Sequence, residues 1–317
     1  MNEFDLIRKL THSLPGNESV VTGAGDDCAV LDFGLPDRQV LFKTDAVVQG
    51  VHFDATAAPE KIGHKALARC LSDVAAMAGT PNAALITLGL PPEFDPDYVV
   101  RIYDGIRLLA RRHGVAVVGG ETTANPGGLL ISVALLGFVP RGKGVLRSGA
   151  EPGDAIFVTG ELGGSRAAKH LEFEPRLTEA QWLAGHFSIH AMIDLSDGLA
   201  GDLRHVLTAS GVGAELLGGS IPVSRAAKAA ARERSSGKTA LQAALSDGED
   251  FELLFTVASR DAVPVLDAWR KQFPKLALTC VGKIKAGQGI HIRDKQGLKP
   301  LSAMGFDHFA SGANANK

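Results

Sequence analysis

Residues 60–90 have the sequence EKIGHKALARCLSDVAAMAGTPNAALITLGL, in which one apolar pattern gives way to another. In residues 60–78, small and apolar side chains recur every four positions, which is the spacing of one face of a helix. These side chains are Ile62, Ala66, Cys70, Val74 and Ala78. Residues 82–90 form an almost continuous apolar run of strand length. A helix followed by a strand predicts a fold that combines helices with a sheet.

The same alternation extends in both directions from this stretch. A β-branched run at 39–48 predicts a strand, and residues 97–113 predict an amphipathic helix that leads into strands at 114–120 and 128–140. A connector rich in glycine and charge, RGKGVLRSGAEPGD, then separates the two halves of the chain. The second half is predicted to contain strands at 155–159, 191–195, 213–217, 251–257, 278–284 and 289–293, with helices at 163–170, 198–210 and 260–272 and further helices between 224 and 245.

This order of elements predicts an α/β or α+β fold with two domains, which also suits a chain of 317 residues. Because the connector lies between two alternating series, we expect the first domain to span residues 1–145 and the second residues 146–310. Residues 311–317, SGANANK, are small and polar, and we expect them to form a disordered tail.

Composition narrows the function classes. Hydrophobic residues make up 45% of the chain, and 33 basic residues nearly balance 35 acidic ones, which argues against nucleic acid or an acidic membrane as the main partner. No apolar run approaches the length of a membrane span. The three cysteines are far apart in the sequence, which is typical of a protein of the reducing cytoplasm.

One pattern recurs in both halves: an acidic residue beside glycine, serine or threonine, next to an apolar run or on a helix. The examples are GAGDDCAV (Asp26, Asp27), FKTDAVV (Thr44, Asp45), CLSDVAAM (Asp73), VVGGETT (Glu121), IDLSDGL (Asp194, Asp197) and SDGEDFELLF (Glu249, Asp250). Carboxylate and hydroxyl oxygens are suited to Mg²⁺, and nucleotide phosphates commonly complete its coordination. Since two carboxylates three residues apart repel each other, we interpret Asp194 and Asp197 as metal ligands.

Taken singly, these acids also have structural explanations. Asp26 and Asp27 could form a turn, and Asp73 could belong to an ion-pair ladder on the helix surface. Ser196 or Asp197 could cap the helix that follows. The sequence contains no GxxxxGK[ST] loop, no GxGxxG after a strand, no HExxH and no GxSxG. The acids as a group therefore favour metal-assisted nucleotide chemistry.

In this combination the motifs resemble the thiamine-monophosphate kinase family, in the superfamily of ATP-binding proteins that includes aminoimidazole ribonucleotide synthetase. The matching stretches run in the family's order over nearly the whole chain, and the most specific are TDAVVQGVHF, LSDVAAMAG and IDLSDGL. The resemblance implies ATP-dependent phosphorylation of thiamine monophosphate to thiamine diphosphate, with several Mg²⁺ ions. It also implies a homodimer, in which N-terminal mixed-sheet domains bind ATP and pair with each other, followed by a C-terminal α/β domain.

The resemblance further implies roles for individual residues. The expected Mg²⁺ ligands are Asp27, Thr44, Asp45, Asp73, Glu121, Asp194 and Asp197. The expected nucleotide-binding residues are Gly120, Glu121, Arg147 and Ser196, and the expected substrate-binding residues are His52, Glu249 and Phe306. No general base is assigned, because a phosphate monoester acceptor is already largely ionised near neutral pH. Direct in-line transfer of the ATP γ-phosphate is the expected course.

Two positions depart from the family pattern. Glu121 stands where the family usually has Asp, which changes the reach of the carboxylate toward an ion that demands near-ideal octahedral distances. Asp247 replaces a glycine shortly before Glu249 and adds charge near the expected substrate site. Two other functions therefore stay open: an ATP-using enzyme of the same superfamily with a different acceptor, and a non-catalytic nucleotide sensor.

Overall fold

The computed structural model describes residues 3–301 except residues 168, 235 and 236. The helices of the N-terminal half are α1 (Glu3–Thr11), α2 (Pro59–Ala76) and α3 (Pro96–Arg112). Its strands are β1 (Val20–Thr22), β2 (Ala29–Leu31), β3 (Arg38–Val48), β4 (Thr80–Leu90), β5 (Ala116–Ala124) and β6 (Leu130–Pro140). The strands form one sheet in the order β1-β2-β3-β6-β4-β5, in which β4 and β5 are parallel and the other neighbours antiparallel.

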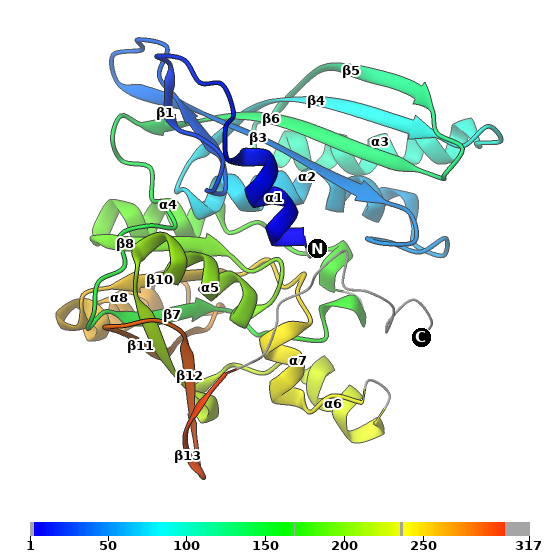
Figure 1. Ribbon diagram of the computed structural model, residues 1–317. Coiled ribbons are helices and arrows are strands. Elements are labelled where there is room, and N and C mark those ends of the chain that lie inside the picture. The colour runs from blue at the N-terminus through cyan, green and yellow to red at the C-terminus, as the bar shows by residue number, and fades with distance from the viewer. Residues whose placement is uncertain (1–2, 168, 235–236, 302–317) are drawn as a thin grey trace.

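This first sheet has two different faces, because successive side chains of a strand point to opposite sides. On β3, Leu41 and Val47 are buried, whereas Phe42 is exposed. Helices α2 and α3 lie against the buried side (Figure 1). We call this side the inner face and the opposite side the outer face. The inner face carries Leu41, Val47, Ile86 and Val133, and the outer face carries Phe42, Leu85 and Leu136.

The C-terminal half contains a second sheet in the order β13-β12-β9-β11-β7-β10-β8, in which β9 and β12 are parallel and the other neighbours antiparallel. Its strands are β7 (Ala155–Thr159), β8 (Ile189–Asp194), β9 (Gly213–Leu217), β10 (Leu253–Val257), β11 (Leu278–Lys285), β12 (Ile290–Asp294) and β13 (Gly297–Pro300). Its helices are α4 (Leu177–His186), α5 (Leu199–Ser210), α6 (Arg225–Glu233), α7 (Ala240–Ser246) and α8 (Ala262–Gln272).

The central strands of the second sheet are buried on both sides, which explains their continuous apolar sequences. On one side, Phe157 and Phe255 stack with ring centroids 5.4 Å apart and belong to a core shared with α2. On the other side, Ile156 and Leu254 belong to a core formed with α5 and α7. The two halves are therefore joined by continuous apolar packing.

Helix α2 lies between the two sheets (Figure 1). It packs on β3 and β6 of the first sheet and also contacts α4 and β8 of the C-terminal half. Nearly all of its residues are buried, including Lys65, Ser72 and Asp73. These polar side chains have little access to water, so they need partners from both halves of the molecule.

The predicted fold class is confirmed: helices combine with two mixed sheets in two halves. The predicted helix at 163–170 is wrong, because this segment forms the short 3₁₀ turns η1 (Ser165–Ala167) and η2 (Lys169–Leu171). Gly163 and Gly164 have positive φ angles of 83° and 70°, which break a right-handed helix. Helix α4, which has no clear apolar periodicity in LTEAQWLAGH, was not predicted. The expected domain boundary at 145 lies in the connector between β6 and β7.

In the described part of the chain, no helix combines the length and the hydropathy that crossing a bilayer requires.

Candidate active site

Three aspartates from distant segments meet between the two halves of the molecule. Asp27 precedes β2, Asp73 lies on α2, and Asp194 ends β8. All three are buried, and one carboxylate oxygen of each lies within 4.8 Å of the oxygens of the other two. Ser72 donates a hydrogen bond of 2.6 Å to Asp194. We call Asp27, Asp73 and Asp194 the acidic cluster.

The acidic cluster concentrates negative charge where water is scarce. Burial, reinforced by the charge of Asp27, raises the pKa of Asp194 to about 7. Burial also raises the pKa of Asp73, although Lys43 opposes it. The buried Oδ2 of Asp27 has no hydrogen-bond partner among the described residues. The donor set fits Mg²⁺, because hard oxygen ligands suit this ion and its charge would stabilise the ionised carboxylates.

Two basic side chains border the acidic cluster. Lys43 Nζ lies 2.8 Å from Asp73 Oδ1, and Arg147 Nη2 lies 2.6 Å from Asp27 Oδ1. Burial alone would lower the pKa of both bases, but the adjacent aspartates outweigh it and raise the pKa above the ordinary value. Asp26 accepts a hydrogen bond of 3.1 Å from the Arg147 backbone N–H. The expected nucleotide-binding Arg147 is therefore fixed at the edge of the cluster.

Asp45 and Thr44 point to opposite faces of β3. Asp45 lies on the inner face, 3.3 Å from the Arg69 guanidinium. Thr44 is exposed, and its hydroxyl lies 3.5 Å from Ser132 Oγ on the outer face. The structure thus brings Asp45 to the side of the sheet that holds α2, but it does not bring the Thr44 hydroxyl to the acidic cluster.

The charged residues of α2 pair with other elements and not with one another. Lys65, Arg69 and Asp73 follow one another at four-residue intervals, which is the arrangement of a possible ion-pair ladder. Their observed partners are Glu249, Asp45 and Lys43. The structural explanation of Asp73 as part of a surface ladder is therefore wrong.

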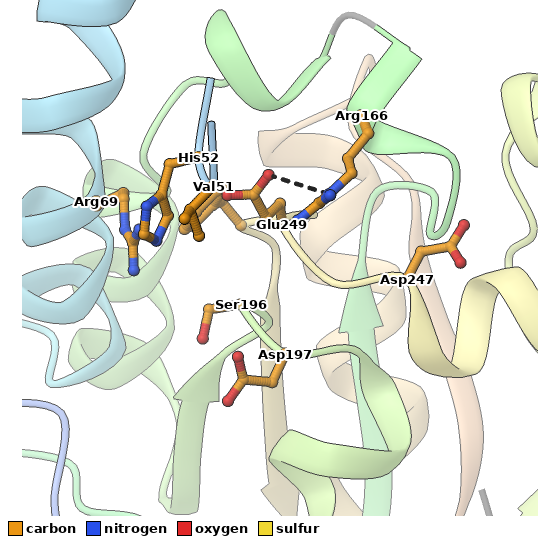
Figure 2. A pocket seen from close by; sticks show the side chains of 9 residues that line it. Val51, His52, Arg69, Arg166, Ser196, Asp197, Asp247 and Glu249 are labelled. Atoms are coloured by element: carbon orange, nitrogen blue, oxygen red, sulfur yellow. Dashed lines mark ion pairs between the residues drawn. The ribbon is translucent and has the colours of Figure 1, made fainter. Parts of the chain in front are cut away.

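Ser196 and Asp197 lie in the segment between β8 and α5. The N-cap residue of helix α5 is Gly198, which has no side chain to cap it. Instead, the Asp197 backbone N–H donates a hydrogen bond of 3.1 Å to the buried Asp202 carboxylate. Figure 2 shows Ser196 and Asp197 across a pocket from His52 and Arg69. Both are therefore placed where a ligand between the two halves would contact them.

This pocket lies between the two halves of the molecule, and its space of about 370 Å³ is partly open to solvent. Its lining residues are Val51, His52 and Arg69 from the N-terminal half and Arg166, Ser196, Asp197, Asp247, Glu249 and Phe251 from the C-terminal half (Figure 2). The expected substrate residues His52 and Glu249 both belong to it. Phe306, the third expected substrate residue, lies outside the described residues.

Glu249 is a buried carboxylate in the pocket wall. It lies 2.6 Å from Lys65 Nζ, 3.1 Å from His170 Nδ1 and 3.8 Å from Arg166 Nε. Burial would raise the pKa of Glu249, but its contacts with His170 and Lys65 outweigh this and lower the pKa to about 2. Glu249 therefore carries a full negative charge at neutral pH.

Two backbone N–H groups of the glycine-rich loop GELGGS (160–165) are occupied by carboxylates. Gly163 N–H donates to Asp250, and Gly164 N–H donates to Asp247 at 3.0 Å. Asp247 also pairs with Lys238 at 2.8 Å. These N–H groups are not open to a phosphate, and the Asp247 carboxylate points away from Glu249 (Figure 2).

Gly120 and Glu121 lie on β5, at the edge of the first sheet. The register places Asp45, Val133, Ile86 and Gly120 in one row across β3, β6, β4 and β5. Three strand spacings amount to about 14 Å. Glu121 occupies the next row, so its side chain is on the outer face, where it is exposed. Within one chain, the structure does not bring Glu121 to the acidic cluster.

Sequence reasoning did not find the basic residues of the site: Lys43, Arg69, Arg166 and His170. It considered Lys65 only as a member of the possible surface ladder, although Lys65 directly precedes the apolar residues Ala66 and Leu67 in the predicted helix. A lysine at such a position indicates a buried charge that needs a partner.

The fold and the acidic cluster together define a protein of two halves, each with a mixed sheet and helices, that share a buried cluster of carboxylates. In agreement, residues 25–139 match the family model described as "AIR synthase related protein, N-terminal domain". The chain is also similar over nearly its full length to curated proteins named thiamine-monophosphate kinase. It belongs to the thiamine-monophosphate kinase family.

Two of these relatives illustrate the similarity. The protein from Rhodopirellula baltica is 41% identical over 291 residues, covering 90% of this chain and 89% of the relative. The protein from Salmonella typhimurium is 36% identical over 335 residues and covers 98% of both. A solved structure described as "AaThiL complexed with AMPPCP and TMP" superposes with a TM-score of 0.80 at 32% identity, covering 97% of both chains.

Proposed function

We propose that this protein transfers the γ-phosphate of ATP to thiamine monophosphate, giving thiamine diphosphate. It is a phosphotransferase whose acceptor is itself a phosphate group. Membership of the thiamine-monophosphate kinase family supports this reaction, as does the similarity to a structure that holds AMPPCP and TMP. The observation in the chain itself that carries the proposal is the convergence of Asp27, Asp73 and Asp194 from both halves within 4.8 Å.

In this proposal Asp27, Asp73 and Asp194 hold Mg²⁺, and Asp45 and Asp197 are further ligands at the two sides of the site. When bound, Mg²⁺ supplies positive charge to the phosphate oxygens of the nucleotide. Arg147 adds a fixed positive charge beside Asp27, and Ser196 offers a hydroxyl to the nucleotide. The acidic cluster and its bases are already ordered by Ser72, Lys43 and Arg147, so little reorganisation is needed on binding.

The transfer needs no general base on the protein. The acceptor phosphate monoester has a second pKa of about 6, so it is mostly dianionic at neutral pH. The difficulty is to bring two anions together, which calls for positive charge and alignment. We propose direct in-line attack, with Glu249 and His52 holding the thiamine part of the acceptor in the pocket.

The reaction is tested by incubating the protein with ATP, Mg²⁺ and thiamine monophosphate and separating the products by chromatography. Thiamine diphosphate formation that stops on chelation of Mg²⁺ is the expected result. ATP binding without product formation would favour a nucleotide sensor. Turnover of another phosphate ester in place of thiamine monophosphate would favour a different acceptor within the same superfamily.

We also propose that the protein is a homodimer that pairs through the outer face of the first sheet. Phe42 pairs with Leu136 across β3 and β6, Leu85 lies on the same face of the next strand β4, and the three residues are 40–48% exposed. A cluster of large exposed side chains on a regular sheet is typical of a subunit interface. A second copy is the natural occupant, because two-fold pairing matches one apolar face with itself.

Such a dimer would give Gly120 and Glu121 a role that a single chain does not allow. Glu121 lies about 14 Å from β3 and on the face opposite the acidic cluster. We propose that Gly120 and Glu121 of each copy contribute to the nucleotide and metal site of the other copy. The additional methylene of Glu121 would extend its reach across the interface.

We further propose a cytoplasmic location. Cys28, Cys70 and Cys280 are all free thiols, and the first two are buried. Free cysteines are typical of a reducing compartment.

A further inference from the structure

Lys65 on α2 is a charged side chain with no exposed surface. Its ammonium group has three N–H bonds, and all three have acceptors. They point to the His52 carbonyl at 2.6 Å, to His170 Nδ1 at 2.7 Å and to Glu249 Oε1 at 2.6 Å. Burying a lysine is costly unless it is fully paired. The complete hydrogen bonding of the Lys65 ammonium group therefore indicates a specific role.

The three partners of Lys65 come from separate parts of the chain. His52 follows β3, His170 belongs to η2, and Glu249 follows α7. His52 and Glu249 line the pocket from opposite halves of the molecule. Lys65 therefore links His52 and Glu249, which lie on opposite sides of the pocket, through its own hydrogen bonds. Burial lowers the pKa of Lys65 to about 8, which leaves it mostly protonated at neutral pH.

Glu249 needs such support because its backbone is strained. Its φ angle is 56°, a left-handed conformation that non-glycine residues seldom adopt. Phe251, two residues later, has a φ angle of 49°. Strained residues persist when their surroundings hold them, and the ion pair with Lys65 reaches Glu249 from the opposite half of the molecule.

The same arrangement leaves one oxygen of Glu249 without a hydrogen bond. His170 Nδ1 lies 2.7 Å from Lys65 Nζ and 3.1 Å from Oε2, and it cannot accept a hydrogen bond from Lys65 and donate one to Oε2 at the same time. Accordingly, Oε2 has no hydrogen-bond partner among the described residues. Arg166, which is half exposed, lies 3.8 Å from it across the pocket. A donor or a cationic ring of a ligand would complete the bonding of this oxygen.

We propose that Lys65 is a positioning residue for substrate recognition: it holds Glu249 in place so that Oε2 remains available to a donor group or cationic ring of the substrate. This role rests on the proposed function, in which the substrate is thiamine monophosphate. That molecule carries both an exocyclic amino group and a cationic thiazolium ring. Lys65 touches neither substrate nor nucleotide and acts through Glu249 and His52.

The test compares Lys65→Met, Glu249→Gln and the double variant, with Lys61→Met as a matched control. Lys61 lies one turn earlier on α2 and forms an exposed ion pair with Glu172. Steady-state kinetics give KM for thiamine monophosphate and kcat, and calorimetry gives Kd for AMPPCP. We expect Lys65→Met to raise KM about tenfold or more, as loss of a charged hydrogen bond does, with a much smaller change in kcat and in the AMPPCP Kd.

The double variant tests whether Lys65 acts through Glu249. The double variant removes both buried charges. We therefore expect it to fold even if Lys65→Met, which leaves an unpaired buried carboxylate, fails to fold. A KM of the double variant equal to that of Glu249→Gln supports the proposal, because coupled residues are not additive. A further rise in KM over Glu249→Gln, or an unchanged KM in folded Lys65→Met, overturns it.

The wild-type assay separates this proposal from the proposed function. If the wild-type protein makes no thiamine diphosphate, the function is wrong and the role of Lys65 falls with it. If wild type is active and Lys65→Met weakens AMPPCP binding as much as it raises KM for thiamine monophosphate, Lys65 is a general structural residue. In that case only the positioning role is rejected.

Discussion

Asp194 ends a buried strand and lies beside two other buried aspartates, a position in which an isolated carboxylate would be unstable. Burial and the charge of Asp27 raise its pKa to about 7, while Ser72 and the nearby bases favour the ionised form. A ligand that brings positive charge would therefore stabilise the ionised carboxylates. The same logic applies to Asp73, which has Lys43 on one side and Asp194 on the other.

At the residue scale, we predict that Asp73→Asn weakens the binding of Mg²⁺ that the reaction requires. An amide keeps the size of the side chain but loses its charge, so the Mg²⁺ concentration for half-maximal rate should rise about tenfold or more. The measurement is the initial rate of thiamine diphosphate formation over a range of Mg²⁺ concentrations. The control is Asp104→Asn, an exposed aspartate of α3 that pairs with Arg107. An unchanged Mg²⁺ dependence would remove Asp73 from the metal site.

At this scale, the sequence pattern indicated the acids of the site and the family resemblance indicated Arg147, but no pattern indicated Lys43. Asp27, Asp73 and Asp194 stand next to glycine, serine or another aspartate, which is a readable pattern. Lys43 contacts Asp73, which is 30 positions away in the sequence, and Arg147 contacts Asp27, which is 120 positions away. Such contacts depend on how the strands are ordered in the sheet, which one sequence does not reveal.

At the scale of elements, local sequence and tertiary contacts compete. Most helices and strands were predicted to within a few residues because their apolar periodicity agrees with the observed burial. The segment 163–170 was predicted as a helix, yet Asp250 binds both the Gly163 N–H and the Ser165 hydroxyl and holds it in 3₁₀ turns. This carboxylate lies 85 or more residues away in the sequence, so no local pattern could indicate it.

Helix α5 allows a prediction about pH. Burial, followed by the charge of Arg147, lowers the pKa of His205 to about 4 from its ordinary value of 6.5. The unfolded chain therefore binds a proton before the folded one does, and stability is lost as pH falls from 6.5 toward 4. From pH 8 to pH 5, this residue should remove about 2 kcal/mol from the free energy of unfolding.

Urea unfolding of wild type and His205→Gln at the two pH values measures this contribution. The variant has no titrating group at this position, so its stability should fall by about 2 kcal/mol less than that of wild type. His186→Gln, an exposed position on α4, should behave like wild type. Equal losses in wild type and His205→Gln would show that position 205 does not contribute to acid sensitivity.

At the scale of the whole molecule, the outer face predicts the oligomeric state. Phe42→Glu would place a charge in the centre of the proposed interface, where burying it without a partner is costly. We expect the wild-type protein to be a dimer by light scattering after size exclusion and the variant to be a monomer at micromolar concentration. Leu108→Glu, at an exposed apolar residue of α3, should remain a dimer. A monomeric wild type would refute the interface.

A mixed-dimer experiment tests whether Glu121 acts on the other copy. Asp73→Asn and Glu121→Gln should each have low activity alone. In a mixed dimer, one site receives both substitutions and the other receives neither, so random exchange should restore about a quarter of wild-type activity. If both substitutions affect the same chain's site, mixing restores nothing. Full activity of Glu121→Gln alone would exclude Glu121 from the metal site.

The whole-molecule arrangement was the part least accessible to sequence reasoning. The motifs indicated two domains and a set of acidic residues, and they placed Thr44 and Glu121 among the expected metal ligands. The register of β3, β6, β4 and β5 shows that both side chains belong to the outer face. A sequence shows that successive side chains of a strand alternate between two faces of a sheet. It does not show which of the two faces lies against the helices and which is left exposed.

Because Lys65 and Asp73 lie on the same helix, α2 also fixes the distance between them. Eight residues of helix span about 12 Å, so the proposed substrate pocket and the proposed metal site are held at a constant separation. A single-residue insertion between them would rotate one end by about 100° relative to the other and misalign donor and acceptor phosphates. Under the proposed function, α2 would therefore select acceptors of one length, because an acceptor with a shorter or longer distance between its ring and its phosphate would contact only one of the two sites.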